Sequence, residues 1–414
     1  MTRRYFYMIM VACGLSALTS CVDYSDAASE TSARIQLLLP EDFTGTATLE
    51  GHEVILQQGS TRLPATTDAN GVAIFNGIIP DVYDLSCSWE LTEAEYHQAT
   101  GSNQSVSGCT VSGSKNSLLI KEEQTINLAT QFSINQDIII SKIYYAGSKD
   151  NNNRAYDAGK YIEIYNQSDK DIDVSGYYIG LVEAESKSNQ AYTLDNLHEA
   201  FADSIVLLKQ IFRIPADANK KIAAGGTLLI VNSAIDHTAN NTSLESDLSG
   251  ADFEAKDLSG KLQNNPATPA LELIYTMYSS ISIMNLVQSG PCGVVIFHTD
   301  EDVTALPTTY PYGKTSGNQW KLLPKRMILD AVEVLGYKAT EATGVEVTTK
   351  RLYDDLDAGY THINATSGRN GEVVYRKTSK KTDDGRIILM DTNNSSNDFQ
   401  VSSTIKPREY DDEE

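Results

Sequence analysis

The chain has 414 residues, of which 33 are Lys or Arg and 55 are Asp or Glu, and its formal net charge is −22 at pH 7. A protein of this charge repels nucleic-acid phosphates, so the composition argues against direct binding to DNA or RNA. Hydrophobic residues make up 41% of the chain, which is enough for packed cores, and the length indicates two or three domains.

A short basic segment and then an apolar segment open the chain. Arg3 and Arg4 precede residues 5–18, which are almost wholly apolar. A membrane-spanning helix needs about 20 apolar residues, so this length predicts a secretory signal peptide over residues 1–20. The run closes on Leu-Thr-Ser-Cys, which resembles a bacterial lipobox. That resemblance implies cleavage before Cys21 and a diacylglycerol on the Cys21 sulfur.

The alternative is an ordinary secretory signal in which Cys21 lies near the cleavage site. Under the lipobox interpretation several acyl chains anchor the protein stably without a protein span. The mature chain then has 31 basic and 55 acidic residues, a net charge of −24. Residue 22 is Val, whereas an Asp there is typical of lipoproteins retained in the inner membrane, so we expect an outer-membrane location. Asp23 and Asp26 resemble acidic residues of some surface-exported lipoproteins, and residues 21–32 predict a tether.

Short strand candidates separated by turn residues follow between residues 33 and 131. They are Arg34–Leu39, Thr46–Leu49, Val54–Gln57, Gly71–Phe75, Val82–Trp89 and Gln124–Leu128. Repeated short strands at this spacing predict a β-sandwich. Residues 67–83, TDANGVAIFNGIIPDVY, resemble a hairpin of prealbumin-like domains, which include carboxypeptidase-regulatory-like and collagen-adhesin B-type modules. The resemblance implies that fold and no particular activity, and Asp81 stands where the family usually has Gly.

Three cysteines lie in the body of the chain, at Cys87, Cys109 and Cys292. A location outside the cytoplasm permits disulfides, and Cys87 and Cys109 belong to the same predicted module. Two interpretations stay open for this pair: a bridge between adjacent strands, or two separately buried thiols. No His or acid follows Cys292 in a nucleophile pattern, which favours a buried thiol there.

The second predicted module spans residues 137–409. A β-rich segment at residues 138–144 and a polar loop precede residues 160–179, KYIEIYNQSDKDIDVSGYYI, which resemble the opening of a lamin-tail domain. Later segments keep the order of that fold, at residues 214–231, 293–297, 329–335 and 367–399. The resemblance implies an immunoglobulin-like sandwich, so the expected fold is all-β with two tandem β-sandwich modules.

Two insertions, near residues 181–213 and 233–290, enlarge this second module and leave room for short helices. Residues 193–208 have apolar side chains at helical spacing, whereas residues 204–214 are rich in β-favouring types, so helix and strand both stay open. Residues 410–414 form an acidic end that we expect to be solvated. The whole arrangement resembles a family of surface lipoproteins of unknown function from Gram-negative gut-type bacteria.

Motifs of catalytic chemistry are missing from the sequence. None of the six His residues forms a pair at i, i+4 around a Glu, and neither a Gly-x-Ser-x-Gly elbow nor a Gly-rich phosphate loop occurs. His237 beside Asp236 is a conceivable metal ligand, although a lone histidine in a surface loop is more often inert. We therefore expect neither a cofactor nor a dedicated metal site.

Two weaker signals concern calcium and sugars. Residues 149–157 and 354–357 are rich in oxygen ligands but lack the spaced aspartate ladder of a dedicated Ca²⁺ site, which favours solvated loops. Tyr310, Tyr312 and Trp320 have faces that stack on sugar rings, but aromatic side chains in a β-sandwich more often pack in the core.

These observations predict a non-catalytic outer-membrane lipoprotein that acts as a binding or accessory protein at the cell envelope. The expected partner is a glycan, an outer-membrane transporter or a matrix protein. The second module lies farther from the anchor, so we expect it to carry the binding surface. A structural or adhesin assembly component is the first alternative, and an envelope hydrolase with dispersed carboxylates is the second.

Overall fold

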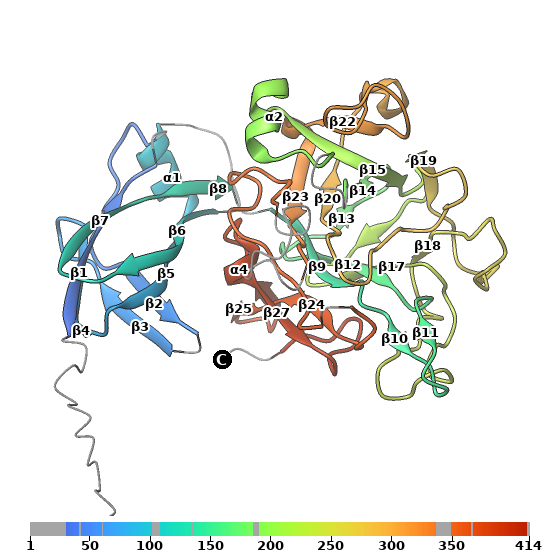
Figure 1. Ribbon diagram of the computed structural model, residues 1–414, viewed down its shortest axis with the longest axis horizontal. Helices are drawn as coiled ribbons and strands as arrows, with labels where there is room; N and C mark the ends of the chain where they lie inside the picture. Colours follow the sequence, from blue (N-terminus) through green and yellow to red (C-terminus); the bar gives the residue numbers. More distant parts are fainter. Residues whose placement is uncertain are drawn as a thin grey trace, which may run out of the picture.

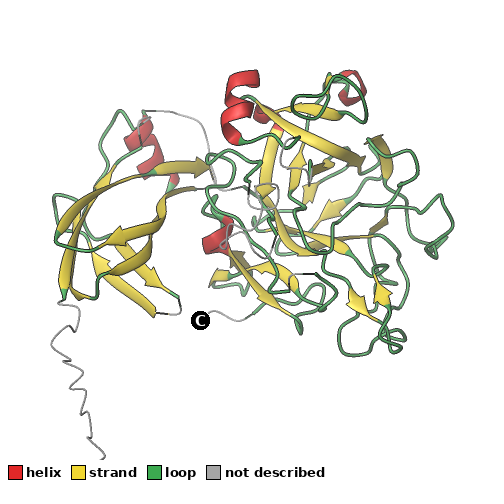
Figure 2. Cartoon of the chain, in the orientation of Figure 1, coloured by secondary structure: helices red, strands yellow, loops and turns green. Residues whose placement is uncertain are grey.

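The computed structural model describes residues 30–40, 43–59, 61–101, 108–134, 136–184, 190–336, 349–365 and 367–411. Over these residues the chain forms two β-rich modules, one after the other, with a few short helices (Figures 1 and 2). The predicted all-β sandwich fold is thereby confirmed. The expected signal peptide and Cys21 lie outside the described residues. Within the described ranges no helix is long and apolar enough to cross a membrane.

The first module consists of two facing sheets. One has the order β4 (Val72–Ile78), β1 (Thr31–Leu38), β7 (Gln124–Ala129). The other has the order β3 (Thr61–Thr66), β2 (Glu53–Gln58), β5 (Asp81–Leu91), β6 (Cys109–Ile120), β8 (Gln131–Ile134). Side chains alternate between the faces of a strand, so Ala33, Ile35 and Leu37 of β1 all enter the core between the sheets.

Several elements of this module differ from the sequence-based expectation. Residues 46–49 form no strand, whereas β3, β6 and the helix α1 (Glu93–Thr100) were not expected. A capping box starts α1, because the Thr92 hydroxyl accepts from the Glu95 N–H and the Glu95 carboxylate accepts from the Thr92 N–H.

The strand register decides between the two interpretations of the cysteine pair. Cys109 lies opposite Leu91, whereas Cys87 lies opposite Gly113, so the two cysteines are offset along the paired strands. Both are buried free thiols, which favours the second interpretation, two separately buried thiols. Burial raises the pKa of each thiol to about 12. Cys292 is likewise a buried free thiol.

The second module also contains two main sheets around its largest core. The six-stranded sheet has the order β18 (Phe253–Glu254), β17 (Thr227–Val231), β12 (Tyr161–Asn166), β9 (Ile138–Tyr144), β24 (Val373–Arg376), β27 (Phe399–Ser402). The seven-stranded sheet has the order β21 (Thr308–Thr309), β22 (Trp320–Pro324), β15 (Ile205–Arg213), β14 (Tyr178–Val182), β20 (Val294–Phe297), β23 (Ile328–Val332), with β19 (Glu272–Thr276) also on β15.

Short two-stranded pairs and helices complete the module. The pairs are β10 (Ser148–Lys149) with β11 (Ala155–Tyr156), β13 (Ile172–Asp173) with β16 (Lys221–Ile222), and β25 (Thr378–Lys381) with β26 (Ile387–Leu389). The short α-helices are α2 (Leu194–Phe201) and α4 (Ser395–Asp398). The first insertion thus forms a helix and then a strand, so each of the two predicted alternatives is present in its own part. The left-handed residues Ala202 and Asp203 follow α2 and end the helix, and β15 comes next.

The acidic end of the chain is partly built into the second module, contrary to expectation. The Tyr410 hydroxyl donates to Glu163 Oε1 at 2.6 Å, and Glu163 forms a fully buried ion pair with Lys142, also at 2.6 Å. The Asp411 carboxylate accepts from the Tyr375 hydroxyl. Residues 412–414 lie outside the described residues. Tyr410 therefore packs over a buried charge pair.

Candidate functional site

The two modules meet at the outer face of the five-stranded sheet of the first module. Alternate residues of β6 place the hydroxyls of Ser112 and Ser114 on this face. Ser112 Oγ donates to the Thr392 carbonyl at 2.8 Å, and Asn394 Nδ2 donates to Ser114 Oγ at 3.0 Å. These contacts bring the closing segment of the second module, residues 391–398, against the first module.

A buried ion cluster holds this closing segment in place. The guanidinium of Arg376 lies 3.0 Å from Asp330 Oδ1 and 3.2 Å from both Asp391 Oδ1 and Asp398 Oδ2. Asp398 also accepts from the backbone N–H and the hydroxyl of Thr392, at 2.9 and 2.7 Å. Burial raises the pKa of Asp398 to about 6. The geometry of the contact between the modules therefore depends on charges inside the second module.

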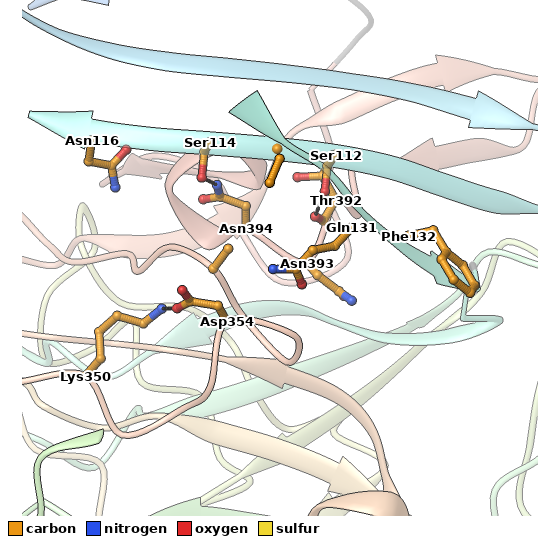
Figure 3. A pocket seen from close by; sticks show the side chains of 13 residues that line it. Ser112, Ser114, Asn116, Gln131, Phe132, Lys350, Asp354, Thr392, Asn393 and Asn394 are labelled. Carbon is orange, nitrogen blue, oxygen red and sulfur yellow. Dashed lines mark hydrogen bonds and ion pairs between the residues drawn. The ribbon is translucent and has the colours of Figure 1, made fainter. Parts of the chain in front are cut away.

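A cavity of about 310 Å³ lies between the modules at this contact. Its lining consists mainly of neutral side chains that form hydrogen bonds: Ser112, Ser114, Asn116, Gln131, Thr392, Asn393 and Asn394 (Figure 3). Among the described residues that line it, Lys350 and Asp354 carry the only charges, and their Nζ and Oδ1 atoms form an ion pair at 2.6 Å. The cavity is consequently neutral within a strongly acidic chain.

Two amide side chains of this lining are available for further hydrogen bonds. Within the described part of the chain, no protein group is hydrogen-bonded to the side-chain amide of Asn116 or Gln131. The ring of Phe132 is half-buried and packs against Phe43 with ring centroids 5.2 Å apart. The cavity therefore offers free amide donors and acceptors, whereas the Phe132 ring packs into a small core of the first module.

A second cavity, of about 560 Å³, also lies between the modules and is more highly charged. Its lining includes the acids Glu90, Asp137 and Asp169 and the bases Lys380 and Arg386. The Lys380 Nζ to Glu90 Oε2 ion pair, at 2.6 Å, joins the two modules across it. The two cavities therefore differ in chemistry: the lining of the first holds one ion pair among neutral side chains, and the lining of the second holds five charged side chains.

His237, the one metal-ligand candidate of the sequence, is not on the surface. It is fully buried, its Nδ1 lies 2.6 Å from the Tyr156 hydroxyl and its Nε2 lies 2.8 Å from the Ser233 carbonyl. Burial lowers its pKa below the usual value. Over the described ranges, no three His, Cys, Asp or Glu side chains gather in a way that suits a metal ion.

In both oxygen-rich loops, carboxylates accept hydrogen bonds from backbone N–H groups of the protein itself. In the first loop, Asp150 accepts from the N–H groups of Asn152 and Arg154 and so closes the β10–β11 hairpin. In the second loop, Asp357 is buried and accepts from the Glu333 N–H at 2.7 Å. These carboxylates therefore hold the backbone of their loops and of the neighbouring strand through hydrogen bonds.

The aromatic candidates of the sequence separate in the structure. Trp320 is only 1% exposed and packs with Tyr192 and Leu207, so it belongs to a core and not to a sugar platform. Tyr312 is 39% exposed and makes an edge contact with the Tyr192 ring. None of these side chains lines the neutral cavity described above.

Of the residues that line the neutral cavity, Asp354 belongs to an oxygen-rich loop considered for calcium, and the others carry no binding signal in the sequence. Asn393 and Asn394 lie in the closing lamin-tail-like segment, where the pattern indicates fold only. The sequence favoured the second module as the binding part, whereas both modules line this cavity. The alternation of polar residues on β6 is the one signal in the sequence that marks a face meeting another surface.

Most of the second module is similar to known protein families. Residues 131–271 match the lamin tail domain, which confirms that resemblance, and residues 223–405 match a family described as a protein of unknown function, DUF4876. A crystal structure of a DUF4876 family protein from Bacteroides thetaiotaomicron is 22% identical, with a TM-score of 0.57. The alignment covers 89% of this chain and 94% of that chain, so the two proteins share their fold.

Two other solved structures resemble parts of the chain at low TM-scores. A Pseudomonas aeruginosa protein with a proposed carbohydrate-binding role is 15% identical over 25% of this chain and 89% of its own, with a TM-score of 0.18. A DUF3823 family protein from Parabacteroides merdae is 11% identical over 47% of this chain and 95% of its own, with a TM-score of 0.16. None of the curated proteins compared with the chain matches it.

Proposed function

We propose that this chain is a lipid-anchored, non-catalytic binding protein of the bacterial outer membrane, and that its ligand is a neutral saccharide bound between its two modules. The observation that supports this function is the neutral cavity of about 310 Å³, lined by amide and hydroxyl side chains. In a chain with 55 acidic residues, such a lining favours an uncharged, polar ligand.

The side chains of the cavity suit the chemistry of a sugar. Sugar hydroxyls both donate and accept hydrogen bonds, and so do the amides of Asn116 and Gln131 and the hydroxyl groups beside them. The volume lies at the lower end of the range of about 300–1,000 Å³ that is typical of small-molecule sites.

Loss of the two free amides is expected to weaken saccharide binding. Each of Asn116→Ala and Gln131→Ala should lower the affinity about fivefold, because a hydrogen bond to a neutral ligand contributes roughly 1 kcal/mol. A glycan array followed by isothermal titration calorimetry on the selected neutral oligosaccharide measures this effect. Gln57→Ala is the matched control, since it removes an exposed amide of β2 outside the cavity.

Three outcomes of this experiment would contradict the proposed saccharide site. If no neutral saccharide binds, or if Gln57→Ala weakens binding as much as Gln131→Ala does, the cavity is not a saccharide site. Binding of acidic oligosaccharides alone would contradict the argument from the neutral lining.

A second prediction tests the membrane anchor. Cells that express the wild-type chain and receive a labelled fatty acid are expected to label the protein, and Cys21→Ala should abolish the label, because the Cys21 sulfur is the proposed attachment point. Cys292→Ala is the control, since that thiol is buried and should leave the label unchanged. A wild-type chain without label, or a labelled Cys21→Ala chain, would refute the anchor.

The hydrolase alternative receives less support from the cavity. A glycosidase of the usual kind needs two carboxyl groups that face one another across the scissile bond. Among the described residues lining the neutral cavity, Asp354 is the single carboxylate, and it is already paired with Lys350. Binding without turnover is therefore the function that this lining favours.

A further inference from the structure

Three large apolar side chains are exposed together at one end of the first module. Ile79, Val82 and Leu119 are 58%, 45% and 49% exposed, respectively. Val82 and Leu119 lie directly opposite each other on β5 and β6, and Ile79 lies in the turn between β4 and β5. We call these three residues the apolar tip. Exposed apolar side chains that are grouped mark an interaction surface more often than scattered ones do.

The apolar tip lies at the end where the chain enters the first module. Thr31, the first residue of β1, lies opposite Ile78, the neighbour of Ile79 (Figure 1, lower ends of β1 and β4). Thr31 follows Cys21 by ten residues, and ten residues span at most about 36 Å when fully extended. An anchor on Cys21 thus keeps the apolar tip within a short distance of the membrane.

We propose that the apolar tip contacts the interfacial layer of a zwitterionic membrane, an inference that rests on the proposed anchor at Cys21. Three side chains give a weak contact by themselves, but the anchor holds them near the lipid at high effective concentration. Of the exposed charged residues beside the tip, Asp81, Glu122 and Glu123 are acidic and Lys121 is basic, so the net charge is negative and an anionic lipid surface would repel this end. Zwitterionic lipid is therefore the partner that the charges allow.

This contact would fix the orientation of the protein relative to the membrane. Ser112, which lines the neutral cavity, precedes Leu119 by seven residues on β6. Asn116, also in the lining, precedes Leu119 by three residues, and Ser112 and Leu119 lie opposite Ser88 and Val82, six residues apart on β5. A strand rises about 3.4 Å per residue, so the lining on β6 extends from roughly 10 to roughly 20 Å beyond the tip. With the tip on the lipid, the cavity is held away from the membrane and open to soluble ligands.

An environment-sensitive fluorophore at the tip tests this contact. Val82→Cys and Leu119→Cys are labelled with a nitrobenzoxadiazole group, which reacts there because the thiols at Cys87, Cys109 and Cys292 are buried. The mature chain, starting at residue 22, is captured through an N-terminal hexahistidine tag on phosphatidylcholine vesicles that contain a nickel-chelating lipid. We expect a blue shift of the emission at both positions and a loss of intensity when the vesicles contain doxyl-labelled lipid.

Leu38→Cys is the matched control, because Leu38 is 41% exposed and ends the strand that Thr31 begins, so it lies at the opposite end of β1. No shift at positions 82 and 119, or an equal shift at all three positions, would overturn the proposal. A blue shift of the emission in the absence of vesicles would indicate that the tip associates with a second copy of the chain, and it would also overturn the proposal. Capture through the tag does not need an acylated Cys21, so failure of the anchor and failure of the tip are distinguishable.

Discussion

Arg376→Leu is expected to lower the free energy of unfolding by about 3–5 kcal/mol, the usual cost of removing one partner of a buried ion pair. The Arg376 side chain is 2% exposed and contacts the carboxylates of Asp330, Asp391 and Asp398. It also donates to the Ile140 carbonyl at 2.8 Å. Without the guanidinium, three buried carboxyl groups lose their counter-charge, and the leucine leaves that backbone acceptor unpaired.

Urea denaturation monitored by circular dichroism measures this loss. Arg326→Leu is the matched control in the same module, because the Arg326–Glu301 pair has a similar distance, 2.8 Å, but side chains that are 65% and 52% exposed. An exposed pair of this kind contributes roughly 0–1 kcal/mol. Equal costs for the two substitutions would show that the buried cluster contributes no more to stability than a surface ion pair.

The stability of the second module is expected to fall as the pH rises from about 4.5 to about 7, and Glu333→Gln should remove part of that fall. Burial raises the pKa of Glu333 from its ordinary value to about 7. Its Oε2 accepts from the N–H groups of Arg351 and Leu352, both at 2.7 Å, whereas Oε1 has no hydrogen-bonding partner in the described part of the chain. The folded state therefore binds the proton more tightly than the unfolded state does.

The sign of this effect follows from proton linkage. Below about pH 4.5 both states are protonated at Glu333 and the group contributes no pH dependence, while above pH 7 the folded state must hold a buried carboxylate. A raised pKa of this size corresponds to about 3 kcal/mol at most. The measurement is the unfolding free energy of wild type and Glu333→Gln from pH 4 to pH 8, with Glu301→Gln as the exposed control.

The amide of a glutamine at position 333 still accepts from both backbone N–H groups and carries no charge. We therefore expect the substituted chain to be more stable than wild type at pH 8 and equal to it near pH 4. A difference between the two chains that stays constant with pH would contradict the assignment of the proton to Glu333.

The strands with a regular pattern were the predictable part of the fold. In β1 every second side chain is buried, and in β9 all seven residues are buried, so alternation and a short apolar run both mark strands correctly. β6 was missed because its middle residues are small and polar, as suits a face that meets the other module. The helix α1 carried a readable signal in Thr92 and Glu95, the capping box.

The candidate site was not predictable from one sequence for a physical reason. Its lining comes from residues 112–116, 129–132, 350–358 and 392–394, which the fold brings together from both modules. The buried end of the chain was hidden for a similar reason. Tyr410 stands in an acidic segment, and its partners Lys142 and Glu163 look like surface charges until β9 and β12 pair and both faces are covered.

The parallel pairing of β1 with β7 has a mechanical consequence for an anchored protein. Pulling on a captured ligand would apply tension between the lipid and the second module. The tension would enter β1 at its first residue and leave β7 through its last residue, toward β8 and β9. Because the two strands are parallel, this load shears all their hydrogen bonds at once and does not peel them one by one. Under such a load, this shear geometry is expected to make the first module resist unfolding more than a peeling geometry would.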